Sequence, residues 1–358
     1  MDYPTKAVAV DAPGLLRRSI PYARVATQLA VAALLLGGLL WRVDLGAVRD
    51  ELEAANPWWL PLAFAANLVS DWFRAIRWQQ FFAPMKRLSL PFLFLIAVVG
   101  VATNLALPLR AGEVLRVQLL RRRTGLSAAS VVATILSEKL TDIVAFSTFI
   151  VLGLVLYRQA RFLWPLALVY GVVLLLGLLG ARWLAGRASR PLWLAVQPEG
   201  LLRARIAREL DAFAQGLQAF RRPGAIFTVV WASHLAWLCE ALMYYACGRS
   251  LGLDLSPAVY LLVVVAATIA VSVPVTQAGL GVFELAIAGL LVAFGVDANR
   301  AAAFSIFSHV MLALPYFASG PLAAFALRLT PRDVLFLGRP AADRSTPTED
   351  APIDCAAP

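Results

Sequence analysis

The chain has 358 residues, of which 60% are hydrophobic and only 15% are charged, and its mean hydropathy is +0.74. This composition lies far outside that of ordinary soluble domains, so it predicts an all-α, polytopic integral membrane protein. The net charge of +10 indicates basic segments at the inner membrane surface. Because no folded soluble module accompanies that charge, we expect no nucleic acid partner.

Nine apolar runs of membrane-spanning length follow one another along the chain. The first run follows a basic segment, residues 1–22, and no signal-peptide cleavage pattern comes after it, so we expect a retained anchor and a cytoplasmic N-terminus. Residues 330–358 are rich in Pro, Asp, Arg and Thr and predict a disordered cytoplasmic tail. The runs are 23–41, 58–82, 91–107, 128–157, 162–184, 225–248, 257–273, 282–296 and 301–329.

Counting every run as one crossing contradicts the positive-inside rule, since it places Arg116 and the basic run 121–123 outside. The charges sort if 91–120 is a hairpin that enters and leaves on the cytoplasmic side and 257–296 is one that enters from outside. We therefore predict about six full spans and two oppositely directed re-entrant or broken hairpins. The outer loops then hold six basic and six acidic residues: Arg42, Arg49, Arg158, Arg161, Arg249, Arg300, Asp44, Asp50, Glu51, Glu53, Asp254 and Asp297.

This arrangement predicts one transmembrane domain, 23–329, that contains an inverted repeat. The two halves are about 58–157 and 225–329, joined by an amphipathic cytoplasmic helix at about 201–221. Each hairpin is broken by Pro and Gly, a pattern of transporters whose interrupted helices form a site near the midplane. We interpret the break residues as hinges, the alternative being simple kinks covered by neighbouring helices: Pro108, Gly112, Pro274, Gly279 and Gly281.

Charged residues near the breaks are the candidate substrate-binding groups, because ionisable side chains within spans are costly unless they serve a function or are paired. At the first break, Arg110, Glu113 and Arg116 can receive an anionic headgroup; alternatively, Arg110 pairs with Glu113 and Arg116 extends to bulk lipid phosphates. The second break offers Gln277 and Glu284.

The fourth apolar run adds a further cluster of charged residues. Glu138 and Asp142 share one helix face, with Lys139 within reach of Asp142. This cluster is either a structural ion pair or a binding site for a headgroup or a coupling ion. Glu240 and His309 stand alone in the sequence and are interpreted as packing residues.

Three motifs in this order, LPLRAGEVLRVQLLRRRTGLS, SEKLTD and VPVTQAGLGVFE, resemble the flippase-like membrane family that includes the transmembrane region of lysylphosphatidylglycerol synthase. The resemblance covers nearly all of the apolar chain. The sequence departs from the family pattern at Lys139, where an Arg is expected, and at Gln277-Ala278, where the family usually has Pro-Gly-Gly. The residues that match are Pro108, Arg110, Gly112, Glu113, Arg116, Glu138, Asp142, Pro274, Gly279, Gly281 and Glu284.

The resemblance implies translocation of a membrane lipid in the bacterial cytoplasmic membrane, the cargo being a phospholipid, a polyprenyl-phosphate-linked lipid or a hopanoid. We expect no cofactor and no metal, since the two histidines, His234 and His309, are far apart and no acid-rich motif has ligand spacing. Only about thirty residues follow the last run, too few for an acyltransferase domain, so we expect a transporter rather than an enzyme. One alternative is an intramembrane lipid-modifying enzyme that uses Glu138 and Asp142 as acid and base. Another is a non-transporting partner of lipid or hopanoid synthesis enzymes.

Overall fold

The computed structural model describes residues 22–107, 110–187, 201–272 and 275–330. All regular structure in these ranges is helical, which confirms the all-α prediction. The 3₁₀ helices are η1 Pro57–Trp59, η2 Arg158–Leu163, η3 Gln218–Arg221 and η4 Gln277–Gly279. The α-helices are α1 Tyr22–Leu40, α2 Leu45–Glu53, α3 Leu60–Phe82, α4 Leu90–Ala106, α5 Ala111–Thr124, α6 Ala128–Leu156, α7 Trp164–Arg187, α9 Leu201–Gly216, α10 Pro223–Ser250, α11 Pro257–Ser272, α12 Val282–Ala293 and α13 Ala298–Ala326.

Helix starts follow local sequence signals. The Ser127 hydroxyl accepts a hydrogen bond from the backbone N–H of Ser130 and caps α6, and Asp297 caps α13 through the backbone N–H of Asn299. Helices α10 and α11 begin with proline, whose missing N–H costs nothing in the first turn.

Among the described residues, four helices are long and apolar enough to cross a membrane: α6, α7 together with η2, α10 and α13. Helices α1 and α2 form a further candidate that is bent by 89°. Helix α3, with 23 residues, is long enough to cross a membrane, but it carries Asp71, Arg74 and Arg77 and is not among these candidates. The protein is therefore a multi-pass membrane protein, and six full spans stays a prediction.

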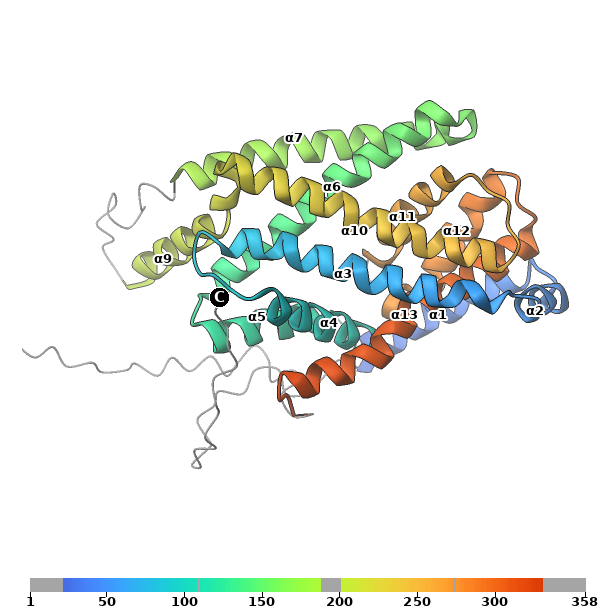
Figure 1. The fold of residues 1–358 in the computed structure, drawn as a ribbon, viewed down its shortest axis with the longest axis horizontal. Helices are drawn as coiled ribbons and strands as arrows, with labels where there is room; N and C mark the ends of the chain where they lie inside the picture. The colour runs from blue at the N-terminus through green and yellow to red at the C-terminus, as the bar shows by residue number, and fades with distance from the viewer. Residues whose placement is uncertain (1–21, 108–109, 188–200, 273–274, 331–358) are drawn as a thin grey trace, which may run out of the picture.

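The described loops gather at two opposite ends of the molecule. Loops 41–56, 157–163, 251–256 and 294–297 form one end, here called the balanced end; its contacts include Asn56 N–H to the Ser250 carbonyl at 2.8 Å and the Tyr157–Phe294 ring contact. Loops 83–89, 125–127, 217–222 and 327–330 form the other, the basic end, where Arg123 donates to the Leu327 carbonyl at 2.7 Å. In Figure 1 the balanced end is on the right, beside α2, and the basic end on the left, beside α9.

Each broken hairpin starts and finishes at one end, as predicted. Lys86 Nζ, before α4, donates to the Thr124 carbonyl at the end of α5, over 2.9 Å at the basic end. Arg300, after α12, donates to the Leu251 carbonyl, before α11, over 3.0 Å at the balanced end. The α4–α5 pair thus lies in the left half of the molecule and the α11–α12 pair in the right half, while α3 and α10 pack along each other between the ends (Figure 1).

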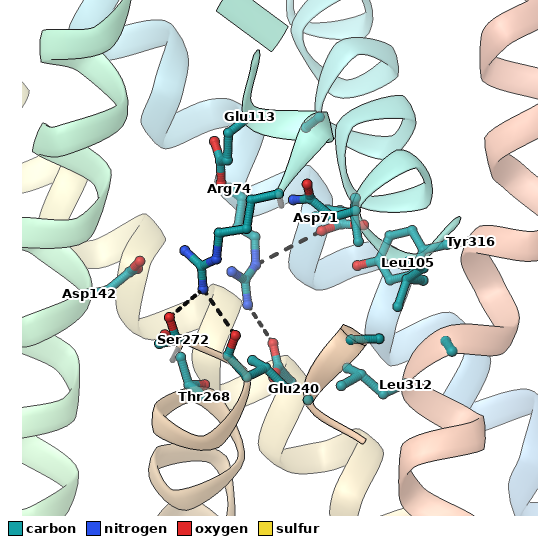
Figure 2. A pocket seen from close by; sticks show the side chains of 18 of the residues that line it. Asp71, Arg74, Leu105, Glu113, Asp142, Glu240, Thr268, Ser272, Leu312 and Tyr316 are labelled. Carbon is teal, nitrogen blue, oxygen red and sulfur yellow. Dashed lines mark hydrogen bonds and ion pairs between the residues drawn. The ribbon is translucent and has the colours of Figure 1, made fainter. Parts of the chain in front are cut away.

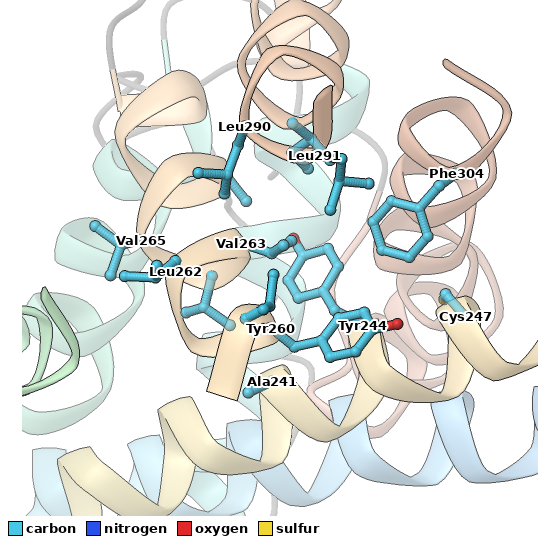
Figure 3. Close-up of a cluster of buried hydrophobic side chains, with 14 of the residues drawn as sticks. Ala241, Tyr244, Cys247, Tyr260, Leu262, Val263, Val265, Leu290, Leu291 and Phe304 are labelled. Atoms are coloured by element: carbon cyan, nitrogen blue, oxygen red, sulfur yellow. The ribbon is translucent and has the colours of Figure 1, made fainter. Parts of the chain in front are cut away.

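Close helix packing depends on glycine at specific contacts. A Cβ on Gly112 would lie 1.8 Å from the carbonyl oxygen of Gly100, so the start of α5 rests directly on α4. A Cβ on Gly248 would lie 1.9 Å from the Tyr260 hydroxyl, which brings α10 and α11 together in the aromatic and aliphatic core seen in Figure 3. Small residues at such contacts are typical of membrane helices.

Candidate functional site

A cavity of about 270 Å³ lies where the two hairpins meet α3, α6, α10 and α13 (Figure 2). Its lining is unusually charged for the interior of an apolar protein. Five basic and five acidic side chains face it: Arg74, Arg77, Arg110, Arg116, Lys139, Asp71, Glu113, Glu138, Asp142 and Glu240. Ionisable groups in membrane proteins gather at substrate and ion pathways, so this cavity is the candidate site.

Helix α3 supplies three of these side chains, Asp71, Arg74 and Arg77, and the sequence interpretation missed all three. They recur every three residues within a largely apolar run, which places them near one face of the helix. That spacing was a signal sufficient to find them.

Two arginines are held in enclosed ion pairs at the cavity wall. Arg77 Nη1 donates to Asp142 Oδ1 over 2.5 Å, and Trp237 Nε1 donates to the same oxygen over 2.8 Å. Arg116 Nη2 donates to both carboxylate oxygens of Glu138, over 3.1 and 2.9 Å. Lys139 therefore acts on Asp142 only from a distance and forms no close ion pair with it, because an arginine from another helix occupies that carboxylate.

At the first break, the structure contains neither a pair of Arg110 with Glu113 nor an Arg116 that extends to bulk lipid. Arg116 is only 8% exposed and lies over the Trp78 ring at 4.0 Å, so it does not extend to bulk lipid. Glu113 Oε2 lies 3.4 Å from Arg116 Nη1, and Arg110 donates instead to backbone carbonyls at the end of α11. Lys139 lines the cavity but is exposed, with no hydrogen bond or close ion pair to any described residue.

The third arginine, Arg74, stands between two acids. It pairs with Glu240 on α10, lies 3.9 Å from Asp71 Oδ1, and stacks over Trp237 at 3.9 Å (Figure 2). Glu240 is therefore not an isolated packing residue, as the sequence suggested, but part of the cavity wall.

The two breaks hold each other by reciprocal hydrogen bonds. Arg110 Nη2 donates to the carbonyls of Val271 and Ser272, at the end of α11, over 3.0 and 2.8 Å. In return, Gln277 Nε2 donates to three carbonyls at the end of α4, those of Asn104, Leu105 and Leu107, over 3.0 to 3.3 Å. Each side chain thus satisfies helix C-terminal carbonyls that would otherwise lack partners inside the bundle.

Unusual backbone conformations accompany both breaks. Leu107, which precedes Pro108, is extended, as residues before proline are, and Arg110 then has a φ of 55°. In the second break Ala278 has a φ of 52°, and Gly279 and Gly281 have φ values of 81° and 82°. Left-handed non-glycine residues cost of order 1–3 kcal/mol and are concentrated at functional sites. Pro108 and Pro274 lie outside the described residues.

Glu284 stands behind the second break rather than in the cavity lining. Its carboxylate accepts from the Gly281 backbone N–H over 2.6 Å and is 2.7 Å from Nδ1 of His309, a cavity residue. His309 therefore has a charged partner and is not isolated. Among the other predicted residues, Arg110, Glu113, Arg116, Glu138, Lys139, Asp142, Gln277 and Gly279 line the cavity, whereas Gly112 and Gly281 are helix-contact positions beside it.

Comparison with known proteins gives one family. No curated protein matches the chain significantly. A family model described as the lysylphosphatidylglycerol synthase TM region matches residues 25–320, which include every residue that lines the cavity. With its all-helical fold and its two interrupted hairpins, the chain belongs to the lysylphosphatidylglycerol synthase transmembrane-region family.

Proposed function

We propose that the protein moves a lipid with an anionic or otherwise polar headgroup between the leaflets of the bacterial cytoplasmic membrane, with both termini cytoplasmic. The observation that supports this most directly is the charged cavity enclosed by apolar helices at the meeting point of two broken hairpins. Membership of a family related to lipid metabolism is consistent with it.

The size and the surroundings of the cavity favour transport of the headgroup alone while the acyl chains stay in the bilayer. A volume of about 270 Å³ suits a small polar group rather than a whole lipid. Exposed Lys139 offers an approach for a phosphate, and Val114 and Leu136, on the neighbouring helices α5 and α6, are exposed apolar residues that suit contact with chains. A phospholipid, a polyprenyl-phosphate-linked lipid and a hopanoid all remain within this class.

The same geometry suggests how transport would proceed. The carbonyls held by Arg110 and Gln277 are the contacts that keep the two hairpins together. An anionic headgroup would compete with those carbonyls for the Arg110 guanidinium, which releases one hairpin from the other. Rocking of the two halves around the cavity would then expose it to either leaflet.

The test is leaflet movement of fluorescent phosphatidylglycerol in proteoliposomes that contain the full chain. We expect faster movement than in empty vesicles. Arg110→Ala and Gln277→Glu should each slow it at least about tenfold, equivalent to ~1.4 kcal/mol, since the first removes a guanidinium and the second puts an acid against three carbonyls.

Matched controls come from the same residue types outside the cavity. Arg49→Ala removes a surface arginine whose side chain is 75% exposed, and Gln79→Glu removes the hydrogen bond that the Gln79 side-chain amide donates to the Leu88 carbonyl. Both controls should move lipid as fast as the native chain per folded molecule. If the Gln79 and Gln277 variants lose equal transport, the breaks have no special role; if no lipid in a broad panel moves, the transport proposal fails.

A further inference from the structure

Two deeply buried acids of the cavity wall, Asp71 and Glu240, share one counter-ion, the guanidinium of Arg74. Arg77 pairs with Asp142, and Arg116 pairs with Glu138 and also lies 3.4 Å from the more exposed Glu113. Asp71 is 2% exposed and Glu240 is 8% exposed. Asp71 Oδ2 has no hydrogen-bond partner in the described chain.

The groups around these two acids do not supply the missing charge. The side chains that face them from neighbouring helices are Arg116 on α5, Asp142 on α6, Tyr244 on α10 and Tyr316 on α13, while α4 carries no titratable residue. Arg116 is engaged by Glu138, and Arg77, one turn beyond Arg74 on α3, is engaged by Asp142. A buried carboxylate without a counter-ion costs several kcal/mol, whereas a protonated carboxyl costs far less.

We propose that Asp71 and Glu240 form a proton-binding site whose occupancy is linked to the anionic group in the cavity. This inference rests on the proposed function for the identity of that group, a phosphodiester. The proton comes from solvent and adds to a carboxylate oxygen of either residue, and no other bond changes.

The linkage follows from competition for Arg74. A phosphodiester that pairs with Arg74 removes the counter-ion that the two acids share, so their affinity for a proton rises. By reciprocity, the proton raises the affinity for the anion. The charge count agrees, because five basic and five acidic residues line the cavity. One added proton leaves a net charge of +1, which matches a phosphodiester of charge −1.

The experiment is calorimetric titration of the detergent-purified full chain with dihexanoyl-phosphatidylglycerol in two buffers of different ionisation enthalpy, which gives the protons taken up per ligand. We expect uptake of about one proton, and up to tenfold weaker binding for each unit by which the pH rises. Dihexanoylglycerol, which has the same chains but no phosphodiester, should cause no proton uptake.

The variant that tests the site is the double substitution Asp71→Asn with Glu240→Gln, which mimics the protonated acids. It should still bind phosphatidylglycerol, with no proton uptake and no dependence on pH, and this retained binding shows that it folds. Asp254→Asn, whose native side chain is 99% exposed in the loop after α10, should behave as the native chain does.

The outcomes separate this inference from the proposed function. Phosphatidylglycerol binding without proton uptake, or uptake that persists in the double variant, overturns the proton site and leaves lipid transport intact. Equal affinity for glycerophosphoglycerol, the headgroup without chains, keeps the proton site but points to a soluble phosphodiester. Absence of binding by the folded native chain overturns both.

Discussion

Arg77 and Asp142 illustrate how a buried charge depends on its partner. Their side chains are 3% and 8% exposed, and Asp142 also accepts from the Trp237 indole. By contrast, the pair Arg49–Glu53 has side chains that are 75% and 62% exposed. If one member of the surface pair is removed, water solvates the charge that is left, whereas the remaining member of the buried pair has no access to water. The two pairs should therefore respond very differently to substitution.

At this scale we predict that Arg77→Gln lowers the free energy of unfolding by about 3–5 kcal/mol, because it leaves Asp142 charged and unmatched. Adding Asp142→Asn to that variant should recover a large part of the loss. Arg49→Gln should cost less than about 1 kcal/mol. Chemical unfolding in detergent, analysed as a double-mutant cycle, measures all three; additive losses from the two buried substitutions would refute the coupling.

Among the elements, the contact of α4 with α5 depends on two glycines. The two helices approach until the Gly100 carbonyl meets the α-carbon region of Gly112. The Gly112 N–H also donates to Asn104 Oδ1 over 2.8 Å, so the start of α5 is tied to the last turn of α4. Gly112 therefore acts here through packing; its role as a hinge stays a prediction.

We predict that Gly112→Ala destabilises the protein by about 1–3 kcal/mol, because the added methyl group forces the two helices apart. Gly289→Ala is the matched control, since nothing lies within 4 Å of a Cβ there and alanine favours helix. Thermal unfolding of both variants in the same detergent compares them. Equal midpoints would mean that α4 and α5 separate freely and that the contact is not required.

For the whole molecule, the charge distribution predicts how it is inserted. The basic end carries Lys86, Arg87 and the run 121–123, whereas the balanced end, counted with Arg249 and Arg300 at the adjoining helix ends, has six acidic and six basic residues. Cytoplasmic loops of membrane proteins are enriched in Lys and Arg. We therefore expect the basic end to face the cytoplasm.

Single cysteines in a cysteine-free background test this orientation. Asp254→Cys, at the balanced end, should react with a membrane-impermeant maleimide in intact spheroplasts. Arg222→Cys, exposed at the basic end, should react only after the membrane is opened. The reverse labelling pattern would invert the topology and would place the phosphate-approach residue Lys139 in the opposite half of the membrane.

Much of this protein follows from its sequence alone. Composition determined the membrane class, apolar runs located the helices, and the conflict of Arg116 and its neighbours with the positive-inside rule revealed two hairpins, since these properties depend on local residue type and on the solvent. The two Pro-Gly breaks were likewise visible, because proline and glycine change the backbone wherever they occur.

Only the tertiary structure decided which charged residues are partners. Spacing along one helix suggested Lys139 for Asp142, but Arg77 from α3 is bound there, and Arg74 gives Glu240 a partner that no sequence distance indicated. The reciprocal bonds of Arg110 and Gln277 arise in the same way. Residue spacing specifies contacts only within a helix, whereas contacts between helices depend on how each one is rotated and packed, which is a property of the whole bundle.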